Sequence, residues 1–207
     1  MARTRRSGNI GVVAQVAATP MHEAISDEDL MHAWQLGDAA AFEALYRRYR
    51  GSLYRFLVRQ AGEPDAGEEL YHDVWMTLVR GRDRWIPAAT LKTYLYRIAH
   101  SRLIDYYRAR KPHSLDVSID ADGGPDLADT CVMSAADAAW KHNAAGDAVR
   151  RCLDALPPAQ REAFLLKEES GLGLGDIATV TGAEPETIKS RVRYAIARLR
   201  KCLEGWL

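Results

Sequence analysis

The sequence has few of the residues that organise small secreted or metal-binding proteins. It has three cysteines in 207 residues, Cys131, Cys152 and Cys202, and no two of them form a Cys-x-x-Cys pair. Neither a disulfide framework nor a zinc site is predicted from an odd number of widely spaced cysteines. We therefore expect reduced thiols, as in a cytoplasmic protein.

Long apolar runs and catalytic motifs are also missing. No apolar stretch approaches the roughly 20 residues that a helix needs to cross a bilayer. The chain has no P-loop, dinucleotide fingerprint or nucleophile elbow. Its histidines are scattered, at positions 22, 32, 72, 100, 113 and 142. We therefore expect that the protein is not an enzyme and that it has no catalytic residue, metal site or cofactor.

The N-terminus has some features of a secretory signal, because three arginines precede the moderately apolar stretch 10–18. Polar residues and a glycine interrupt that stretch, which is atypical of a cleaved signal. We interpret residues 1–25 as a disordered leader.

The net charge is zero, from 28 basic and 28 acidic side chains, but the two signs are unevenly distributed. Residues 38–111 have 14 Lys and Arg against 9 Asp and Glu, whereas residues 112–146 have 1 against 6. Residues 147–207 are nearly balanced, with their positive charge near the end of the chain. An acidic segment thus separates two parts that could each face an anion.

The hydrophobic pattern predicts helices throughout, because apolar residues recur at spacings of three and four and no stretch alternates like a strand. Glycine and proline mark the ends of the expected helices. These cover residues 38–61, 65–80, 90–111, 149–156, 159–167, 174–181 and 185–203, with a further short helix considered at 135–145. We expect an all-α protein of two small bundles, 26–111 and 147–207, joined by a flexible acidic linker, 112–146.

The C-terminal bundle has the spacing of a helix-turn-helix. Ala178 stands where the two helices touch, Gly182 at the turn, and Ile188 anchors the second helix, which Pro185 begins. From residue 187 to 203 this helix has six Lys and Arg and no acidic residue. Such a charge favours contact with DNA, although a protein-docking module or a solvated face has the same pattern.

The N-terminal bundle combines aromatic and basic residues on its last helix, after Trp85. Basic side chains can follow phosphates while aromatic rings stack on unpaired bases. Equally, individual tyrosines could serve only for packing. The residues are Tyr94, Tyr96, Tyr106 and Tyr107 with Arg97, Arg102, Arg108 and Arg110.

Two sets of motifs resemble one family. Asp73-Val74-Trp75, Leu95-Tyr96-Arg97-Ile98-Ala99 and Ile104-Asp105-Tyr106 are similar to the core-binding and promoter-melting region of extracytoplasmic-function sigma factors. Residues 156–166, 175–178 and 187–191 resemble the C-terminal promoter-binding domain of the same group. The resemblance covers about residues 30–205 in the order and spacing of the family.

The resemblance implies the partners and the site residues. The partners are core RNA polymerase (the coiled coil of its largest subunit and its flap), promoter DNA and an anti-sigma factor. Contacts to the polymerase are expected from Glu69, His72, Asp73 and Trp75. Contacts to the minus-ten element of the promoter are expected from Trp85, Ile86, Tyr94, Arg97, Ser101, Asp105 and Arg108. Contacts to the minus-thirty-five element are expected from Thr187, Lys189, Ser190, Arg191, Arg193, Tyr194 and Arg198.

The sequence departs from the family at several of these positions. Many relatives have Gln, Trp and Asn where this chain has His72, Tyr94 and Ser101. A common Arg-Ala-Arg is Tyr194-Ala195-Ile196 here, so two cationic positions are lost. Base reading is expected to depend on Ser190, Arg191 and Arg193.

A second function fits part of the pattern: a helix-turn-helix regulator that binds duplex DNA alone, with the N-terminal half as a sensor or dimerisation domain. It predicts tight binding to a palindromic operator without polymerase. A sigma factor instead predicts weak DNA binding alone and specific transcripts once core enzyme is added.

Overall fold

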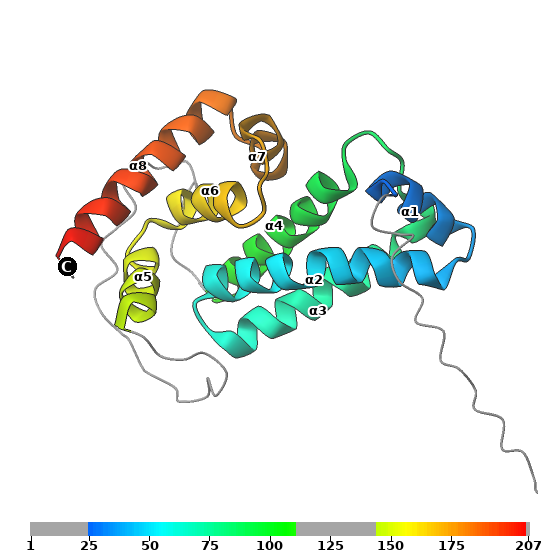
Figure 1. The fold of residues 1–207 in the computed structure, drawn as a ribbon, viewed down its shortest axis with the longest axis horizontal. Helices are drawn as coiled ribbons and strands as arrows, with labels where there is room; N and C mark the ends of the chain where they lie inside the picture. Colours follow the sequence, from blue (N-terminus) through cyan, green and yellow to red (C-terminus); the bar gives the residue numbers. More distant parts are fainter. Residues whose placement is uncertain (1–24, 111–143, 206–207) are drawn as a thin grey trace, which may run out of the picture.

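The computed structural model describes residues 25–110 and 144–205, and all regular structure in these two stretches is helical (Figure 1). The first stretch forms α1 (Asp27–Gln35), α2 (Ala39–Ala61), α3 (Pro64–Arg80), the 3-10 turn η1 (Arg82–Arg84) and α4 (Leu91–Arg110). The second forms α5 (Ala144–Asp154), α6 (Pro158–Glu168), α7 (Leu174–Thr181) and α8 (Pro185–Glu204). The predicted all-α class with two bundles is confirmed. The leader, nearly all of the linker and most of the short helix considered at 135–145 lie outside the described residues.

A tight hairpin joins α2 to α3. Gly62 ends α2 with a φ of +77°, a left-handed conformation that a residue with a side chain rarely adopts. Pro64 then begins α3, where its missing N–H costs no helical hydrogen bond. Gly67 lets the two helices touch, because a Cβ there would lie 2.6 Å from the Cα of Val58. The hairpin therefore depends on two glycines for different reasons.

The core of the first bundle lies between α2, α3 and α4, which pack on one another. Large side chains fill it: Phe56 and Tyr96 are fully buried, with ring centroids 5.4 Å apart in an edge-to-face contact. Leucines complete the core from all three helices, namely Leu45, Leu53, Leu57, Leu70, Leu78, Leu95 and Leu103. Apolar residues that recur at spacings of three and four along these helices thus supply most of the buried core.

Helix α1 was not expected from the sequence. Ser26 caps it by accepting a hydrogen bond from the N–H of Asp29 (3.1 Å). Trp34 packs on Phe42 of α2, with centroids 4.6 Å apart. Ser26 and Asp29, together with buried Leu30, form a capped amphipathic start that the periodicity analysis could have found.

The second bundle contains the predicted helix-turn-helix in α7 and α8. Gly182 makes the turn with a φ of +71°, and Pro185 is the first residue of α8. Ile188 and Ala195 of α8 are fully buried against α6 and α7, whereas Ile196 is 39% exposed. Ala195, and not Ile196, therefore occupies the core position that follows Val192 on α8.

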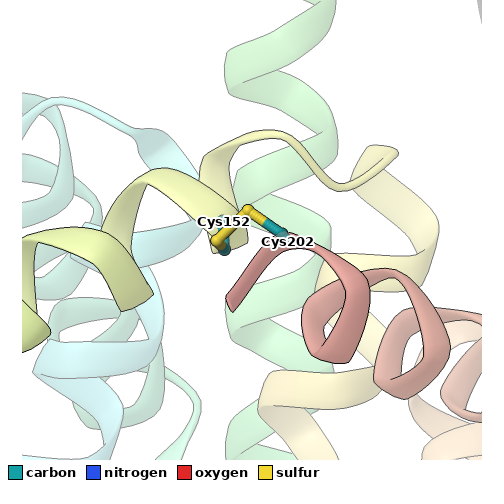
Figure 2. The surroundings of a disulfide bond; sticks show 2 residues. All are labelled: Cys152 and Cys202. Carbon is teal, nitrogen blue, oxygen red and sulfur yellow. A yellow bond between two sulfur atoms is a disulfide. The ribbon is translucent and has the colours of Figure 1, made fainter. Parts of the chain in front are cut away.

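A disulfide joins Cys152 of α5 to Cys202 of α8, with Cα atoms 5.8 Å apart (Figure 2). The expectation of reduced thiols is wrong for these two residues. They are separated by 50 positions, and only the return of α8 along α5 brings them within bonding distance. Cys131 lies outside the described residues.

The two bundles also pack against each other, although two bundles joined by a flexible linker need not be in contact. Helix α7 lies on α4, and α5 and α6 lie on α2. The second bundle therefore covers part of the helix that carries most of the predicted minus-ten residues.

Candidate nucleic-acid interface

A cavity of about 240 Å³ lies beside the start of α4. Trp85 and Ile86 of the preceding loop and Tyr94 and Arg97 of α4 help to line it. Ile86 is 76% exposed, whereas Trp85 is only 8% exposed. The loop thus offers Ile86 to solvent and uses Trp85 as a packing anchor.

Helix α1 positions this loop and the start of α4. The side-chain amide of Gln35 donates hydrogen bonds to the carbonyls of Arg82 (2.8 Å) and Trp85 (3.1 Å). Glu28 accepts a hydrogen bond from the backbone N–H of Leu91 (3.0 Å). These contacts satisfy groups that a loop and a helix start leave without partners. Gln35 and Glu28 are therefore positioning residues that the sequence analysis did not identify.

Thr90 also orders the start of α4. Its hydroxyl accepts a hydrogen bond from the N–H of Thr93 (3.1 Å), which is the geometry of an N-cap.

The remaining predicted minus-ten residues follow one exposed face of α4. Arg97, Ser101, Asp105 and Arg108 are all exposed and are spaced by four, four and three residues. Residues at these spacings lie above one another on a helix. The face has two guanidinium groups at its ends and hydrogen-bonding groups between them, which suits a nucleic-acid strand.

The tyrosines of α4 divide between packing and surface. Tyr96 is fully buried, and burial raises the pKa of its phenol above the ordinary value. The Tyr107 hydroxyl donates to the carbonyl of Gln60. Only Tyr94 lines the cavity. The packing role that the sequence left open therefore describes Tyr96 and Tyr107.

The residues expected to contact polymerase lie on α3. Glu69, His72 and Asp73 are exposed. Trp75 is only 6% exposed and packs on Tyr46, with ring centroids 4.9 Å apart. Trp75 thus belongs to the core in this conformation, and the accessible part of the predicted surface is acidic with one histidine.

The residues expected at the minus-thirty-five element lie on the first three turns of α8, with Arg198 one turn further. The Ser190 hydroxyl donates to the carbonyl of Thr187 (2.8 Å). Lys189 is exposed, with its ammonium 3.4 Å from the carboxylate of Glu186. The guanidinium of Arg193 lies 5.0 Å from the ring centroid of Tyr194, and both are exposed, as is Arg198.

Arg191 differs from its neighbours, because it is only 7% exposed. Its place in the sequence predicted a base-reading role together with Ser190 and Arg193. In the described conformation, Arg193 is accessible to DNA and Arg191 is not.

A second hollow, of about 440 Å³, lies along α8 beside α6 and α7. Four of its lining residues are apolar and four are cationic. The lining residues are Lys167, Leu174, Lys189, Val192, Arg193, Ile196, Ala197 and Arg200. Lys167 adds a cation from α6 that the sequence analysis had not linked to this face.

Residues 25–110 and 144–205 contain no group of three or more His, Cys, Asp and Glu side chains placed to hold a metal ion. Among the helices of these same stretches, none combines the length and the apolar character needed to cross a membrane.

Family models match both halves of the chain. Residues 45–113 match Sigma-70 region 2, and residues 146–199 match Sigma-70, region 4. We refer to the two bundles by these names below. The family models and the helix-turn-helix fold define a transcription factor of the sigma-70 class.

Curated relatives narrow the class. The chain is 31% identical over 198 residues to the ECF RNA polymerase sigma factor SigK of Mycolicibacterium vanbaalenii, covering 93% of this chain and 96% of the relative. It is 29% identical to SigM of Mycobacterium tuberculosis (96% and 94% covered) and 32% identical to RpoE of Cereibacter sphaeroides (79% and 87%). The chain belongs to the ECF RNA polymerase sigma factors, which direct RNA polymerase to promoters.

Two solved structures share the fold. One is the sigma factor RpoE in complex with the anti-sigma factor NepR from Bartonella quintana, with a TM-score of 0.59 and 24% identity over 79% of this chain and 96% of that one. The other is CnrH in complex with the cytosolic domain of CnrY, with a TM-score of 0.62 and 20% identity over 86% and 97%. Because the chain belongs to this family, we discard the alternative that it is a helix-turn-helix regulator that binds DNA without polymerase.

Proposed function

We propose that this sigma factor has three separate binding surfaces, called stations below: one for core polymerase, one for the minus-ten element and one for the minus-thirty-five element. Residues 26–111 bind core polymerase and the minus-ten element, residues 112–146 form the linker, and residues 147–207 bind the minus-thirty-five element. The leader is residues 1–25. The observation that carries the proposal is the cavity beside α4, because a loop with exposed Ile86 and a cation, Arg97, meet there.

At the minus-ten station, the protein holds an opened strand. Melting requires no bond chemistry, only a site that binds an extruded base more tightly than the duplex does, and unstacking costs a few kcal/mol. Tyr94 can stack on such a base, and Arg97 and Arg108 can contact the phosphates on either side. We infer that the protein acts by binding and positioning rather than by catalysis.

At the minus-thirty-five station, α8 enters the major groove of duplex DNA. The exposed residues Lys189, Arg193 and Arg198 contact phosphates and base edges. Stacking of Arg193 on Tyr194 limits the directions in which its guanidinium can point. This pair is the part of the surface that replaces the cations lost at positions 194 and 196.

At the polymerase station, the exposed carboxylates of Glu69 and Asp73 on α3 face the coiled coil of the largest subunit. The flap of the polymerase contacts residues 147–207. An anti-sigma factor covers these polymerase-binding surfaces when the protein is inactive. We place the protein in the cytoplasm, where its polymerase is.

Transcription in vitro with purified core polymerase on genomic fragments tests the proposal. We expect discrete start sites that core enzyme alone does not give. Arg193→Ala should weaken promoter binding by the roughly 1–3 kcal/mol of a lost base contact and leave core affinity unchanged. Asp73→Arg should lower core affinity and leave the promoter preference of the remaining complex unchanged.

Matched controls separate these effects from general changes in charge. Lys201→Ala removes an exposed cation of α8 outside the predicted DNA-contacting set, and Glu43→Arg reverses an exposed carboxylate of α2. Both should behave like the unchanged protein. The assignment of stations is wrong if Arg193→Ala and Asp73→Arg impair core binding and promoter recognition equally.

A further inference from the structure

Region 4 contributes a lining residue to the predicted base-binding cavity of region 2. Thr179 of α7 helps to line that cavity, together with Tyr94 and Arg97 of α4. The Thr93 hydroxyl, on the same helix start, donates to the carboxylate of Asp176 of α7 (3.3 Å). A base that enters the cavity would therefore meet region 4 as well as region 2.

A buried polar pair holds the two regions together. His100 Nδ1 of α4 and Glu162 Oε1 of α6 lie 2.6 Å apart, with side-chain exposures of 17% and 9%. Groups this buried need a partner, because leaving one of them unpaired costs its full desolvation. The pair thus favours the conformation in which the two regions touch.

Further polar contacts surround α2 at the same interface. The Gln60 side chain donates to the carbonyl of Pro158 (3.3 Å), and Arg161 donates to the carbonyl of Gln60 (3.1 Å). Arg59 forms an ion pair with Glu169. Gln60 and Arg161 are buried, so the interface is specific rather than a loose collision of two surfaces.

The same contact involves a residue expected to read DNA. Arg191 is 7% exposed, and its charge acts on His100 across the interface. In this closed arrangement Arg191 on the duplex-binding helix is buried, and Thr179 of region 4 forms part of the wall of the cavity on the strand-binding helix. In contrast, Glu69, His72 and Asp73 on α3 stay exposed.

From this geometry we propose that the contact between α4 and the pair α6–α7 is an internal off-state, with His100 and Glu162 as its latch. While the latch is closed, the protein can meet polymerase through α3 but cannot capture an extruded base. Release of region 4 from α4 opens the cavity. The inference rests on the proposed function, because it takes the cavity as the minus-ten site.

A buried thiol measures opening without any assay of transcription. Thr93 is 2% exposed, so a cysteine there should react slowly with a maleimide while the regions are closed. In a Thr93→Cys, Cys131→Ser background, the other two cysteines are in the disulfide. Glu162→Gln keeps the shape but removes the charge of a buried hydrogen bond, and we expect at least about tenfold faster alkylation.

Two further variants keep the test specific. Glu168→Gln makes the same chemical change at an exposed position of α6 and should leave the rate unchanged. A His100→Leu, Glu162→Met double variant replaces the ion pair by apolar groups of similar volume and should restore slow alkylation. Because the double variant lacks both members of the pair, rescue would show that the single variant opens because His100 has lost its matched partner. An unchanged rate in Glu162→Gln, or no rescue, would overturn the latch.

Binding of a single-stranded DNA pool links the latch to the cavity. A fluorescent 12-mer of random sequence should bind Glu162→Gln about tenfold more tightly than the unchanged protein, in proportion to the alkylation rate. Faster alkylation without tighter binding would show that closure does not guard the strand site, and the off-state would be wrong. If both increase but core polymerase gains no specific start sites, the latch stands and the proposed function fails.

Discussion

Region 2 and region 4 hold their helices together in different ways. In region 2, the three long helices α2, α3 and α4, of 17 to 23 residues, share a core with several buried aromatic rings. In region 4, helices α5, α6 and α7 have 11, 11 and 8 residues, and a disulfide joins α5 to α8. A small domain buries a smaller fraction of its surface and often needs a covalent link. We therefore expect packing defects to damage region 2 most and loss of the disulfide to damage region 4 most.

The largest expected effect is in the core of region 2. Phe56→Ala removes a fully buried ring from the contact with Tyr96. We expect the free energy of unfolding to fall by about 3–5 kcal/mol, as for other buried aromatic truncations. Urea unfolding followed by circular dichroism measures it. Tyr54→Ala, at a 39% exposed position of the same helix, should cost much less, and equal losses would contradict the assignment of the core.

Loss of the disulfide should weaken region 4 selectively. Replacing Cys152 and Cys202 by serine removes a cross-link between positions 50 apart. We expect a loss of about 2–4 kcal/mol, seen as faster amide hydrogen exchange in α5 and α8. Exchange in the core of α2 and α3 should change little. A reducing agent should reproduce the effect in the unchanged protein, and Cys131→Ser should not.

Two glycine-to-alanine substitutions, one in each region, should have smaller effects on stability, and these should be of opposite sign. Gly67→Ala in region 2 places a Cβ 2.6 Å from the Val58 backbone, and we expect a loss of about 1–3 kcal/mol from overpacking. Gly175→Ala in region 4 meets no atom within 4 Å. Because alanine favours a helix, it should stabilise by up to about 1 kcal/mol. Thermal melts that shift in the same direction would contradict the description of these sites.

The smallest expected effect is the pH dependence of the contact between the regions. Burial disfavours the charged form of His100, but hydrogen bonding to Glu162 and its charge overcome this and raise the pKa above its ordinary value, against the opposing charge of Arg191. Stabilisation of the closed form should be complete below about pH 6.5 and be lost as the pH rises through the raised pKa. The radius of gyration from small-angle scattering should grow over that range, and in Glu162→Gln it should not follow the pH in this way.

The sequence predicted most helices because their apolar spacing reports local geometry. It also predicted the Gly182 turn and the Pro185 helix start, which depend on properties of single residues. Helix α1 was missed although Ser26 and Leu30 form a capped amphipathic start. That miss matters for the site, because Gln35 and Glu28 of α1 hold the loop and the start of α4.

What the sequence could not predict are contacts between distant positions. Spacing places Arg191 beside Ser190 and Arg193, but in the folded protein it is only 7% exposed, whereas Arg193 is exposed. Likewise, Cys152 and Cys202 carry no local sign of pairing. Periodicity fixes which face of a helix is apolar, but not which other element will cover its polar residues. The residue contacts proposed for polymerase and DNA remain predictions, because they involve partners outside the chain.

The link between Cys152 and Cys202 turns the intervening chain into a closed covalent ring that contains the whole helix-turn-helix. A single cut by a protease within that ring would not release either piece, so the two fragments would migrate as one band until a thiol is added. The reading helix would keep its attachment to the rest of the protein even after its backbone connection to α7 had been severed.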